Sequence, residues 1–439
     1  MIKNKISLLL TTCLMHIITI EIFSQDCCKN ICYCCKDICC GCLYNNNKKS
    51  EQDQEQDQEQ YFDRLLENFD KNIKKFNDSI FSEDSDSTNA KYTIVKDGPA
   101  SNNGILGKGT WGTVYKVKNK KGEIFALKKA FVQEKYPFMG KNEIQALIKC
   151  RKCENVIKIV DVYKKKEKEK KNIENKGKVD GFYYYIITEL YDHGDLSHSL
   201  FRLKNLYLDI HSIILRRIIY QMINAVKQVH DKGIIHRDIN LLNFFIGKKD
   251  YELYLGDFGC ASEQYDGIFA GNFSYCCKHL LDYLNEKGEV LKHNENFNKL
   301  YKFLDIFALA TSIFHLLTGD SFWSLISSND LINENITADE KWKIINDRSE
   351  GKDISKKLSI FRYTAKELNE NNDLNPDKWQ ELDEYKKLDS DFVDILKKVL
   401  LESNFEKFEK FDVVTIDDLT KSDFYKGLKL LVEEEEKLA

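Results

Sequence analysis

Two short polar motifs constrain this chain more than any other feature. The first is the run HRDINLLN from His236 to Asn243, and the second is the triplet DFG that begins at Asp257, with a strand-like stretch between them. Asp238 offers a carboxylate that can orient a hydroxyl group. Asn243 and Asp257 offer an amide oxygen and a second carboxylate, the ligand types that magnesium prefers. Either motif alone would be weak, but their order and spacing indicate a site for phosphoryl transfer.

A glycine-rich string lies upstream of these motifs. It reads GKGTWGTV from Gly107 to Val114 and fits the pattern G-x-G-x-x-G-x-V. By itself this pattern could equally belong to a dinucleotide-binding unit or to an ordinary hairpin with glycine turns. Here strand-like segments flank it at 105–106 and 115–117, and a further one at 124–127 follows a turn. This alternation predicts a β-hairpin flap rather than a strand that leads into a helix.

Together with the triplet Ala-Leu-Lys that ends at Lys128, these motifs resemble those of the eukaryotic protein kinase family, over roughly residues 91–430. The resemblance implies a bilobal α+β fold. We expect residues 91–189 to form a small, mainly antiparallel β N-lobe with one regulatory helix, and residues 190–439 to form a larger, mainly α-helical C-lobe. The implied cofactors are ATP and Mg²⁺, and the implied substrate is a protein serine or threonine.

The resemblance also assigns nucleotide-binding roles. Backbone amides of the flap would cover the ATP phosphates, Lys128 would hold the α and β phosphates, and Glu143 would pair with Lys128. Thr188 falls at the gatekeeper position, and backbone groups of Glu189 and Tyr191 would bond the adenine edge. The other expected ATP contacts are flap glycines and apolar residues around the adenine: Gly107, Gly109, Gly112, Leu106, Val114, Ala126 and Phe245.

Three positions depart from the family pattern. Asn240, which we place in the catalytic set, stands where serine/threonine kinases usually have a lysine. Asn272 replaces a threonine that ordinarily contacts that lysine and the catalytic aspartate, so we expect Asn240 and Asn272 to touch. His279 replaces the glutamate of an A-P-E motif, and no arginine follows Arg362 to pair with it. Because losing both members of a buried ion pair can be nearly neutral, we interpret this as a remodelled substrate platform, enlarged by an insert at 285–298.

Two further roles follow from the resemblance. Asp305, in a predicted buried helix, would brace the backbone of the catalytic loop. Arg237 would let a phosphate on the activation segment order that loop, with Ser262 and Tyr265 as candidate acceptors. The alternative is a segment that is ordered without phosphorylation.

The N-terminal part has a different composition. An apolar run from Ile6 to Phe23 favours a signal peptide over residues 1–24, with an uncleaved membrane anchor as the alternative. Residues 25–90 are expected to form a cysteine-rich segment and a low-complexity linker. The cysteines repeat with heptad spacing between Cys27 and Cys42, which suits disulfides, acylation or, least favoured, a metal site.

Polar runs within this linker, at 45–60 and 79–89, predict disorder. The charged insert at 164–178 is predicted to be a solvated loop. A short amphipathic helix that docks on the catalytic domain, docks on a partner or stays half-exposed is predicted from the helical spacing of Tyr61, Phe62, Leu65, Leu66, Phe69 and Phe76.

The whole chain is expected to be a protein serine/threonine kinase that acts as a monomer and is secreted or held in a secretory organelle. Its N-terminal segment or acylated cysteines would provide membrane association, and the net charge of −4 gives no reason to expect a nucleic-acid partner. Lysine and asparagine are plentiful while proline is scarce, which suggests a coding bias toward AT-rich DNA. The signal peptide, this bias and the altered end of the activation segment resemble secreted, rhoptry-type kinases of apicomplexan parasites. A pseudokinase, which docks partners and binds ATP without catalysis, is the alternative that Asn240, Asn272 and His279 motivate.

Overall fold

A computed structural model of the chain describes residues 51–83, 87, 89–96, 104–109, 112–135, 138–171, 178–191, 193–199, 212–247, 252–263, 271–294, 296–333, 335–349, 358 and 383–438. The predicted signal peptide, the cysteine repeat and Tyr265 lie outside these residues. The chain divides into two units, residues 1–59 and 60–439, and the contacts given below lie within the second.

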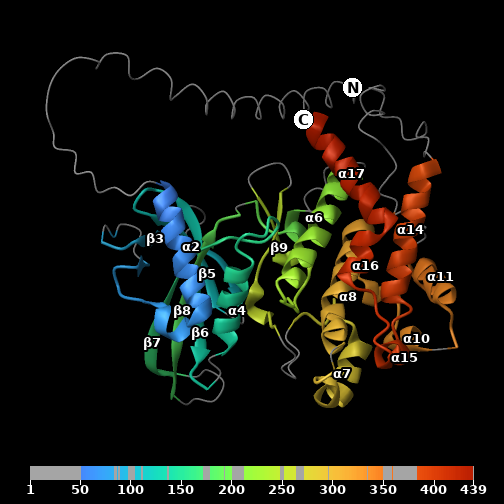
Figure 1. Cartoon of the computed structure of the whole chain (residues 1–439), viewed down its shortest axis with the longest axis horizontal. Helices are drawn as coiled ribbons and strands as arrows, with labels where there is room; N and C mark the ends of the chain where they lie inside the picture. Colours follow the sequence, from blue (N-terminus) through green and yellow to red (C-terminus); the bar gives the residue numbers. More distant parts are fainter. Residues whose placement is uncertain are drawn as a thin grey trace, which may run out of the picture. The chain divides into compact units, whose positions relative to one another are not determined.

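An eight-stranded sheet forms the first half of this second unit (Figure 1). Its order is β1-β7-β8-β6-β5-β3-β2, with β4 paired to β5, and only the β1–β7 and β2–β3 pairs are parallel. The strands are β1 (Lys74–Lys75), β2 (Phe81–Ser82), β3 (Tyr92–Ile94), β4 (Ile105–Gly109), β5 (Gly112–Asn119), β6 (Ile124–Gln133), β7 (Ile159–Lys171) and β8 (Lys178–Glu189).

The predicted flap is confirmed as the β4–β5 hairpin, and β5 continues into β6 through a tight turn. Asn119 closes this turn because its Oδ1 accepts hydrogen bonds from the backbone N–H groups of Lys121 and Glu123, at 2.8 and 3.0 Å. Gly122 has a φ of 83°, a left-handed conformation that glycine adopts without a steric penalty. Local turn chemistry therefore sets the register of the two strands that carry the flap and Lys128.

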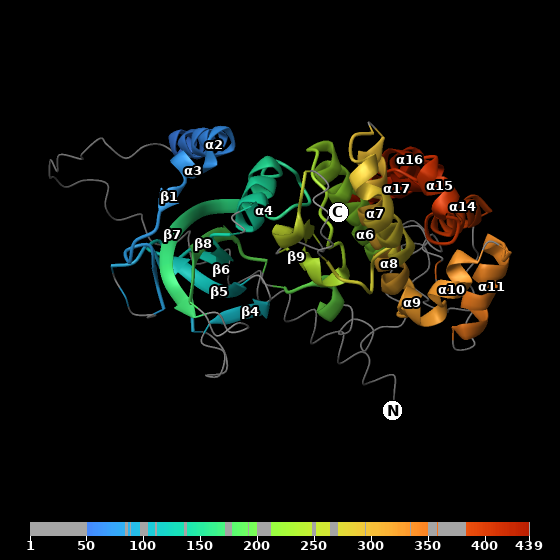
Figure 2. The same ribbon diagram turned by 90° about the horizontal axis from the view of Figure 1, so that it is seen from below.

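The second half of the unit is helical. Its central helix, α8 (Phe297–Thr318), is apolar on nearly every side and ends at Gly319, whose φ is 79°. Around it lie α6 (Ser212–Asp231), α7 (Lys278–Leu291), α9 (Phe322–Leu325), α10 (Ser328–Ile332), α11 (Ala338–Arg348), α14 (Asp383–Leu400), α15 (Phe405–Glu409), α16 (Ile416–Lys421) and α17 (Asp423–Leu438). Figure 2 shows these helices grouped apart from the sheet.

Among the described residues, α8 is the one helix with the length and hydropathy of a membrane span, and most of it is buried among the other helices. A core helix of this kind passes the same test of length and composition. We therefore assign α8 to the core of the helical lobe.

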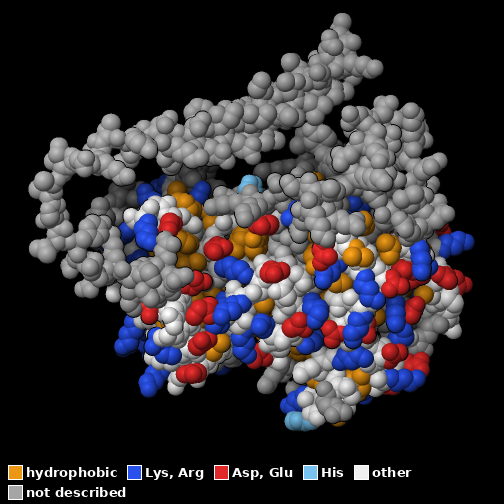
Figure 3. All heavy atoms as spheres, turned by 45° about the horizontal axis from the view of Figure 1, so that its top comes forward, with side chains coloured by type: hydrophobic (Ala, Val, Ile, Leu, Met, Phe, Trp, Pro, Cys, Tyr) orange, Lys and Arg blue, Asp and Glu red, His pale blue; other side chains and the backbone are white. Residues whose placement is uncertain are grey.

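The bilobal α+β fold expected from the sequence is confirmed. Helix α4 (Phe138–Lys149) lies against the sheet, and β8 leads towards the helical lobe. A short hairpin of β9 (Phe244–Ile246) and β10 (Leu253–Leu255) follows the catalytic loop. On the face in Figure 3, acidic and basic side chains are interspersed.

Three sequence predictions about local structure were wrong. Residues 51–60, predicted to be disordered, form most of α2 (Glu51–Glu67), because glutamate and glutamine are good helix formers and extend the apolar helix that follows. Residues 164–171, predicted to be a solvated loop, extend β7 and pair with β8. Phe81 and Ser82, within the run at 79–89 that was predicted to be disordered, form β2 and pair with β3.

The predicted amphipathic helix exists and docks on the catalytic domain. It comprises α2 and the short α3 (Phe69–Asn72), and its side chains Phe62, Leu65 and Phe69 are buried in the main hydrophobic core. Strands β1 and β2, which precede residue 91, also belong to the main sheet. The sheet lobe thus includes part of the segment expected to be a linker.

Candidate active site

Three charged side chains from three elements meet at the centre of the site. Lys128 lies on β6, Glu143 on α4, and Asp257 precedes the short 3-10 helix η2 (Phe258–Cys260). The Lys128 Nζ atom is 2.6 Å from Glu143 Oε1 and 3.0 Å from Asp257 Oδ1. The expected Lys128–Glu143 pair is therefore formed, and the same ammonium group also holds the carboxylate expected to bind magnesium.

Burial and charge act against each other in this cluster. Burial alone would lower the pKa of Lys128, but Glu143 and Asp257 outweigh it and raise that pKa above its ordinary value. For Asp257, burial favours a raised pKa, but the neighbouring Lys128 outweighs burial and the pKa of Asp257 is lowered. Burial raises the pKa of Glu143, and the attraction of Lys128 opposes it. Lys128 and Asp257 are thus held in their charged forms.

The catalytic loop surrounds Asp238 with neutral donors. Asn243 Nδ2 donates to Asp238 Oδ2 at 2.9 Å and to its backbone oxygen at 2.8 Å. Asn240 caps the 3-10 helix η1 (Leu241–Asn243), since its Oδ1 accepts from the Leu242 N–H at 2.9 Å, while its Nδ2 donates to Asp238 Oδ1 at 3.2 Å. Burial raises the pKa of Asp238, and nearby His236 and the donors oppose that shift.

Asn240 and Asn272 meet at Asp238, where both donate a hydrogen bond to the same carboxylate oxygen, Oδ1. The backbone N–H of Asn272 donates to Asp238 Oδ1 at 3.0 Å, and its side-chain oxygen accepts from the Ser274 N–H at 2.9 Å. The sequence did not single out Gly271, which precedes it. A Cβ there would lie 2.2 Å from Arg237 O, and its φ is 150°, so glycine allows this segment to approach the catalytic loop.

The expected brace from Asp305 is present. Its two carboxylate oxygens accept from the backbone N–H groups of His236 and Arg237, both at 2.7 Å, and Oδ2 also lies 2.9 Å from His230 Nε2. Arg237 has a φ of 66°, a strained conformation for a residue with a side chain. Burial favours a raised pKa for Asp305, but the hydrogen bond and charge of His230 and the other donors lower it.

The activation-segment candidates are only partly described. Ser262 is buried, and its backbone N–H and C=O both pair with Ile235 at 2.9 Å, which argues against Ser262 as a phosphate acceptor. Arg237 Nη1 donates to Tyr301 OH at 2.8 Å, and Arg237 Nε donates to Cys260 O. These contacts favour the alternative in which the start of the activation segment is ordered without phosphorylation.

The expected nucleotide residues come from both lobes. Across the sheet, Ala126 lies opposite Thr188, and Val114 lies opposite both Gly107 and Lys128. Leu106 is about half-exposed on β4, and Phe245 projects from β9. The structure therefore places Leu106, Val114, Ala126 and Thr188 on the sheet lobe and Phe245 on the hairpin after the catalytic loop.

The segment after Thr188 limits which groups can bind adenine. The Glu189 N–H donates to Lys158 O at 3.0 Å, so of its backbone groups only the carbonyl oxygen could face a ligand. Tyr191 OH donates to Glu189 Oε2 at 3.1 Å, and its ring lies 4.3 Å from that of Tyr254. These contacts fix the Tyr191 side chain and leave its backbone as the group expected to bind adenine.

The three flap glycines have different roles in the fold. A Cβ at Gly107 or Gly109 would meet no protein atom within 4 Å, so packing does not require glycine at either position. At Gly112, whose φ is 138°, a Cβ would lie 2.5 Å from Lys129 O. Gly112 is therefore needed for the hairpin itself, whereas Gly107 and Gly109 leave room for a ligand.

The donor set suits magnesium. Asp257 uses Oδ1 to hold Lys128, and Asn243 uses Nδ2 to hold Asp238, so each keeps an oxygen that could bind a hard cation. Mg²⁺ is commonly held by one or two carboxylates together with substrate phosphates and water. Within the described ranges, no cluster of three or more His, Cys, Asp or Glu side chains could hold a metal unaided. The residues thus fit a magnesium ion that is bound together with a nucleotide.

His279 occupies an aromatic environment instead of an ion pair. It is buried, its ring stacks on Phe408 at 5.6 Å with an interplanar angle of 19°, and its Nε2 lies 3.3 Å from Cys277 Sγ. Burial lowers the pKa of His279 to about 4, with a hydrogen bond to the Ser403 backbone opposing the shift. An uncharged, stacked imidazole ring thus occupies the position at which the family pattern has a glutamate.

Comparisons with known proteins agree with this geometry. A family model described as "Protein kinase domain" matches residues 100–406. The chain is 30% identical over 226 residues to cyclin-dependent kinase-like 1 of Caenorhabditis elegans, and the aligned region covers 50% of this chain and 54% of that protein. It is 29% identical over 177 residues to probable serine/threonine-protein kinase nek2 of Dictyostelium discoideum, 39% of each chain. It is 29% identical over 160 residues to cyclin-dependent kinase 9 of Bos taurus, 36% of this chain and 40% of that protein. The matches span about half or less of these relatives.

Proposed function

The chain belongs to the protein kinase family, and we propose that it transfers the γ-phosphate of ATP to serine or threonine residues of proteins. One observation carries the proposal: Lys128 joins Glu143 and Asp257, while Asp238 and Asn243 are joined in the adjacent loop. A scaffold that only docks partners needs no such pair of preformed clusters. Phosphoryl transfer needs both, because its catalysis consists mainly of positioning and charge stabilisation.

Asp238 is suited to act as the base. A carboxylate has about four lone-pair positions, and three are used by Asn240, Asn243 and the N–H of Asn272, so one remains for a substrate hydroxyl. The donors hold the carboxylate in one orientation. Burial raises its pKa, which strengthens it as a proton acceptor.

Lys128 would bind the ATP phosphates, with Glu143 fixing the direction of its ammonium group. Asn243 and Asp257 would hold Mg²⁺, which when bound neutralises charge on the phosphates. Asn240 supplies a hydrogen bond to Asp238 but no positive charge. The proposed enzyme therefore works without the lysine that this loop position usually provides.

Phosphate transfer from labelled ATP to peptide pools that carry only serine, only threonine or only tyrosine acceptors tests this function. We expect Mg²⁺-dependent labelling of the serine or threonine pools by the full chain and none by Lys128→Met. Labelling of the tyrosine pool alone would overturn the substrate class. ATP binding without any transfer would instead support the pseudokinase alternative, which the uncharged Asn240 motivates.

A second proposal concerns location. We propose that the apolar run at residues 6–23 directs the chain into the secretory route, as in the rhoptry-type kinases that the sequence resembles. Fusion of residues 1–44 to a reporter protein tests this. Release of a shortened reporter supports a signal peptide, retention of the full-length fusion in membranes supports an anchor, and a soluble internal reporter contradicts both.

A further inference from the structure

The helical segment that precedes the sheet, residues 60–73, lies against the helix that carries Glu143. We propose that this segment positions α4 so that Glu143 pairs with Lys128. The inference rests on the proposed function and assigns positioning residues to the same site. None of these residues touches ATP or a substrate in the proposed mechanism.

The first support is burial. Phe62, Leu65 and Phe69 are 2%, 0% and 2% exposed, and they belong to the same hydrophobic cluster as Ile144 and Leu147 of α4. A surface helix that serves only as a spacer would not bury three large side chains so fully. The segment therefore forms part of the core that supports α4.

The second support is a pair of ionic contacts on either side of Glu143. Asp63 Oδ1 lies 2.7 Å from Nη2 of Arg151, which follows the end of α4. Asp70 Oδ2 lies 3.7 Å from Nζ of Lys141, two residues before Glu143, and that ammonium also lies 5.6 Å above the Phe69 ring. The segment thus touches α4 near both of its ends.

The third support is a shared wall on β8. The Tyr184 ring lies 6.2 Å from the Phe69 ring, and a Cβ at Gly140 of α4 would lie only 2.7 Å from the same tyrosine ring. Glycine at this position lets the α4 backbone pack directly on Tyr184. A displacement of Phe69 would therefore move the Tyr184 ring and, through this close-packed contact, shift α4.

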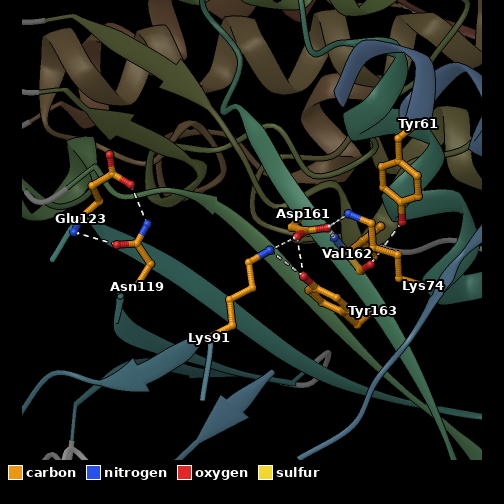
Figure 4. A network of polar contacts seen from close by, with 8 residues as sticks. All are labelled: Tyr61, Lys74, Lys91, Asn119, Glu123, Asp161, Val162 and Tyr163. Carbon is orange, nitrogen blue, oxygen red and sulfur yellow. Dashed lines mark hydrogen bonds and ion pairs between the residues drawn. The ribbon is translucent and has the colours of Figure 1, made fainter. Parts of the chain in front are cut away.

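The end of the segment is fixed to the sheet (Figure 4). Lys74 and Lys91 donate to the two carboxylate oxygens of Asp161, at 2.8 and 2.7 Å, and Tyr61 OH donates to Val162 O at 3.4 Å. Asp161 is 4% exposed, and although burial favours a raised pKa, the two lysines lower it. The two lysines together neutralise this buried carboxylate, and the Lys74 contact ties the end of the segment to β7.

Kinetics of three full-length proteins test the proposal: wild type, Leu65→Ala, and Arg64→Ala as the exposed neighbour on the same helix. Coupling between two sites commonly changes affinity by about 5- to 150-fold, so we expect kcat/KM for ATP to fall by that order in Leu65→Ala. Arg64→Ala should match wild type. Amide hydrogen exchange should show lost protection in α4 but not in α8.

A wild-type value of kcat/KM in Leu65→Ala would overturn the proposal. So would equal loss of protection in α4 and α8, which would mean that the segment only stabilises the whole fold. If wild type transfers no phosphate, the proposed function fails separately, and the dissociation constant of ATP in the same proteins still tests this inference.

A charge exchange gives a second test, which, unlike Leu65→Ala, leaves no cavity in the core. Asp63→Arg and Arg151→Asp should each lower kcat/KM for ATP, and the double variant should recover part of the loss because it restores an ion pair of reversed sense. Additive losses in the double variant would contradict a positioning role for this contact.

Discussion

At the scale of single residues, the uncharged Asn240 is the site's main departure from its family. Its Nδ2 donates to Asp238 Oδ1, and the asparagine side chain carries no positive charge. Asp238 is therefore oriented by three neutral donors, Asn240, Asn243 and the N–H of Asn272. The base is well held, while charge that develops on the transferred phosphate lacks one usual partner.

We predict that Asn240→Lys raises kcat. A preorganised donor that faces developing charge can change kcat by roughly 100-fold, and we expect a gain of at least several-fold because lysine would add such a group. Steady-state kinetics with a saturating peptide substrate measure the effect. Asn240→Ala, which removes the donor without adding charge, should lower kcat, and a lower kcat in both variants would show that the contact to Asp238 matters more than charge.

At the scale of elements, the β4–β5 flap separates structural from ligand-binding glycines. Gly109→Ala should leave stability unchanged or slightly raised, because its Cβ meets open space, but should raise KM for ATP. Gly112→Ala should destabilise the fold by about 1–3 kcal/mol, since its φ of 138° and the Lys129 carbonyl disfavour a side chain. Denaturant unfolding and ATP kinetics on both proteins distinguish the two effects. Equal destabilisation by both would contradict this account.

Helix α4 depends on one close approach. A Cβ at Gly140 would lie 2.7 Å from the Tyr184 ring and 2.9 Å from Val132 Cγ2. Alanine gains about 1 kcal/mol of helix propensity over glycine, whereas overpacking costs about 1–3 kcal/mol. We therefore expect Gly140→Ala to be destabilising in denaturant unfolding and to weaken ATP binding. A stabilised protein with wild-type ATP affinity would show that α4 can shift without affecting Glu143.

At the scale of the whole molecule, the buried His279 links stability to pH. Burial lowers its pKa from 6.5 to about 4, so between these pH values the unfolded chain binds a proton that the folded chain does not. Stability should therefore fall as pH decreases from about 6.5 to 4, by roughly 3 kcal/mol from this residue. The nearby Lys341 acts in the same direction, since its charge also disfavours protonation.

His279→Phe should keep the stacking on Phe408 and remove this part of the pH dependence. Denaturant unfolding of wild type and variant at several pH values measures the difference. Parallel curves for wild type and His279→Phe would show that His279 titrates normally in the folded protein.

The sequence allowed the catalytic fold to be predicted because its polar motifs are local. The loop around Asp238 and the flap glycines are recognisable from spacing, and the structure forms the expected Lys128–Glu143 pair. The contact of Lys128 with Asp257 was not predicted, because it joins residues far apart in the sequence. The docking of Leu65 depends instead on contacts distant in sequence, so helical spacing alone left its partner open. Gly271 gave no signal beyond being a glycine, because its role arises from close approach to the catalytic loop.

The charged extension of β7 was mispredicted for a related reason. Composition around Lys164 and Lys166 suggests solvent, but both residues pair across the sheet with β8 at Tyr184 and Phe182. Lys164 Nζ also lies 4.1 Å above the Phe182 ring. Long lysine stems can cover aromatic surface while the charged end stays in water, which a count of charges does not reveal.

The most direct test of the central claim compares phosphate transfer from ATP by the full chain and by Asp238→Asn, with ATP affinity measured on both. The account predicts that the variant binds ATP with wild-type affinity and transfers no phosphate, because the Asp238 carboxylate orients the substrate hydroxyl and lies outside the Lys128 cluster. Equal transfer by both proteins, or no transfer by a wild-type chain that binds ATP, would contradict it.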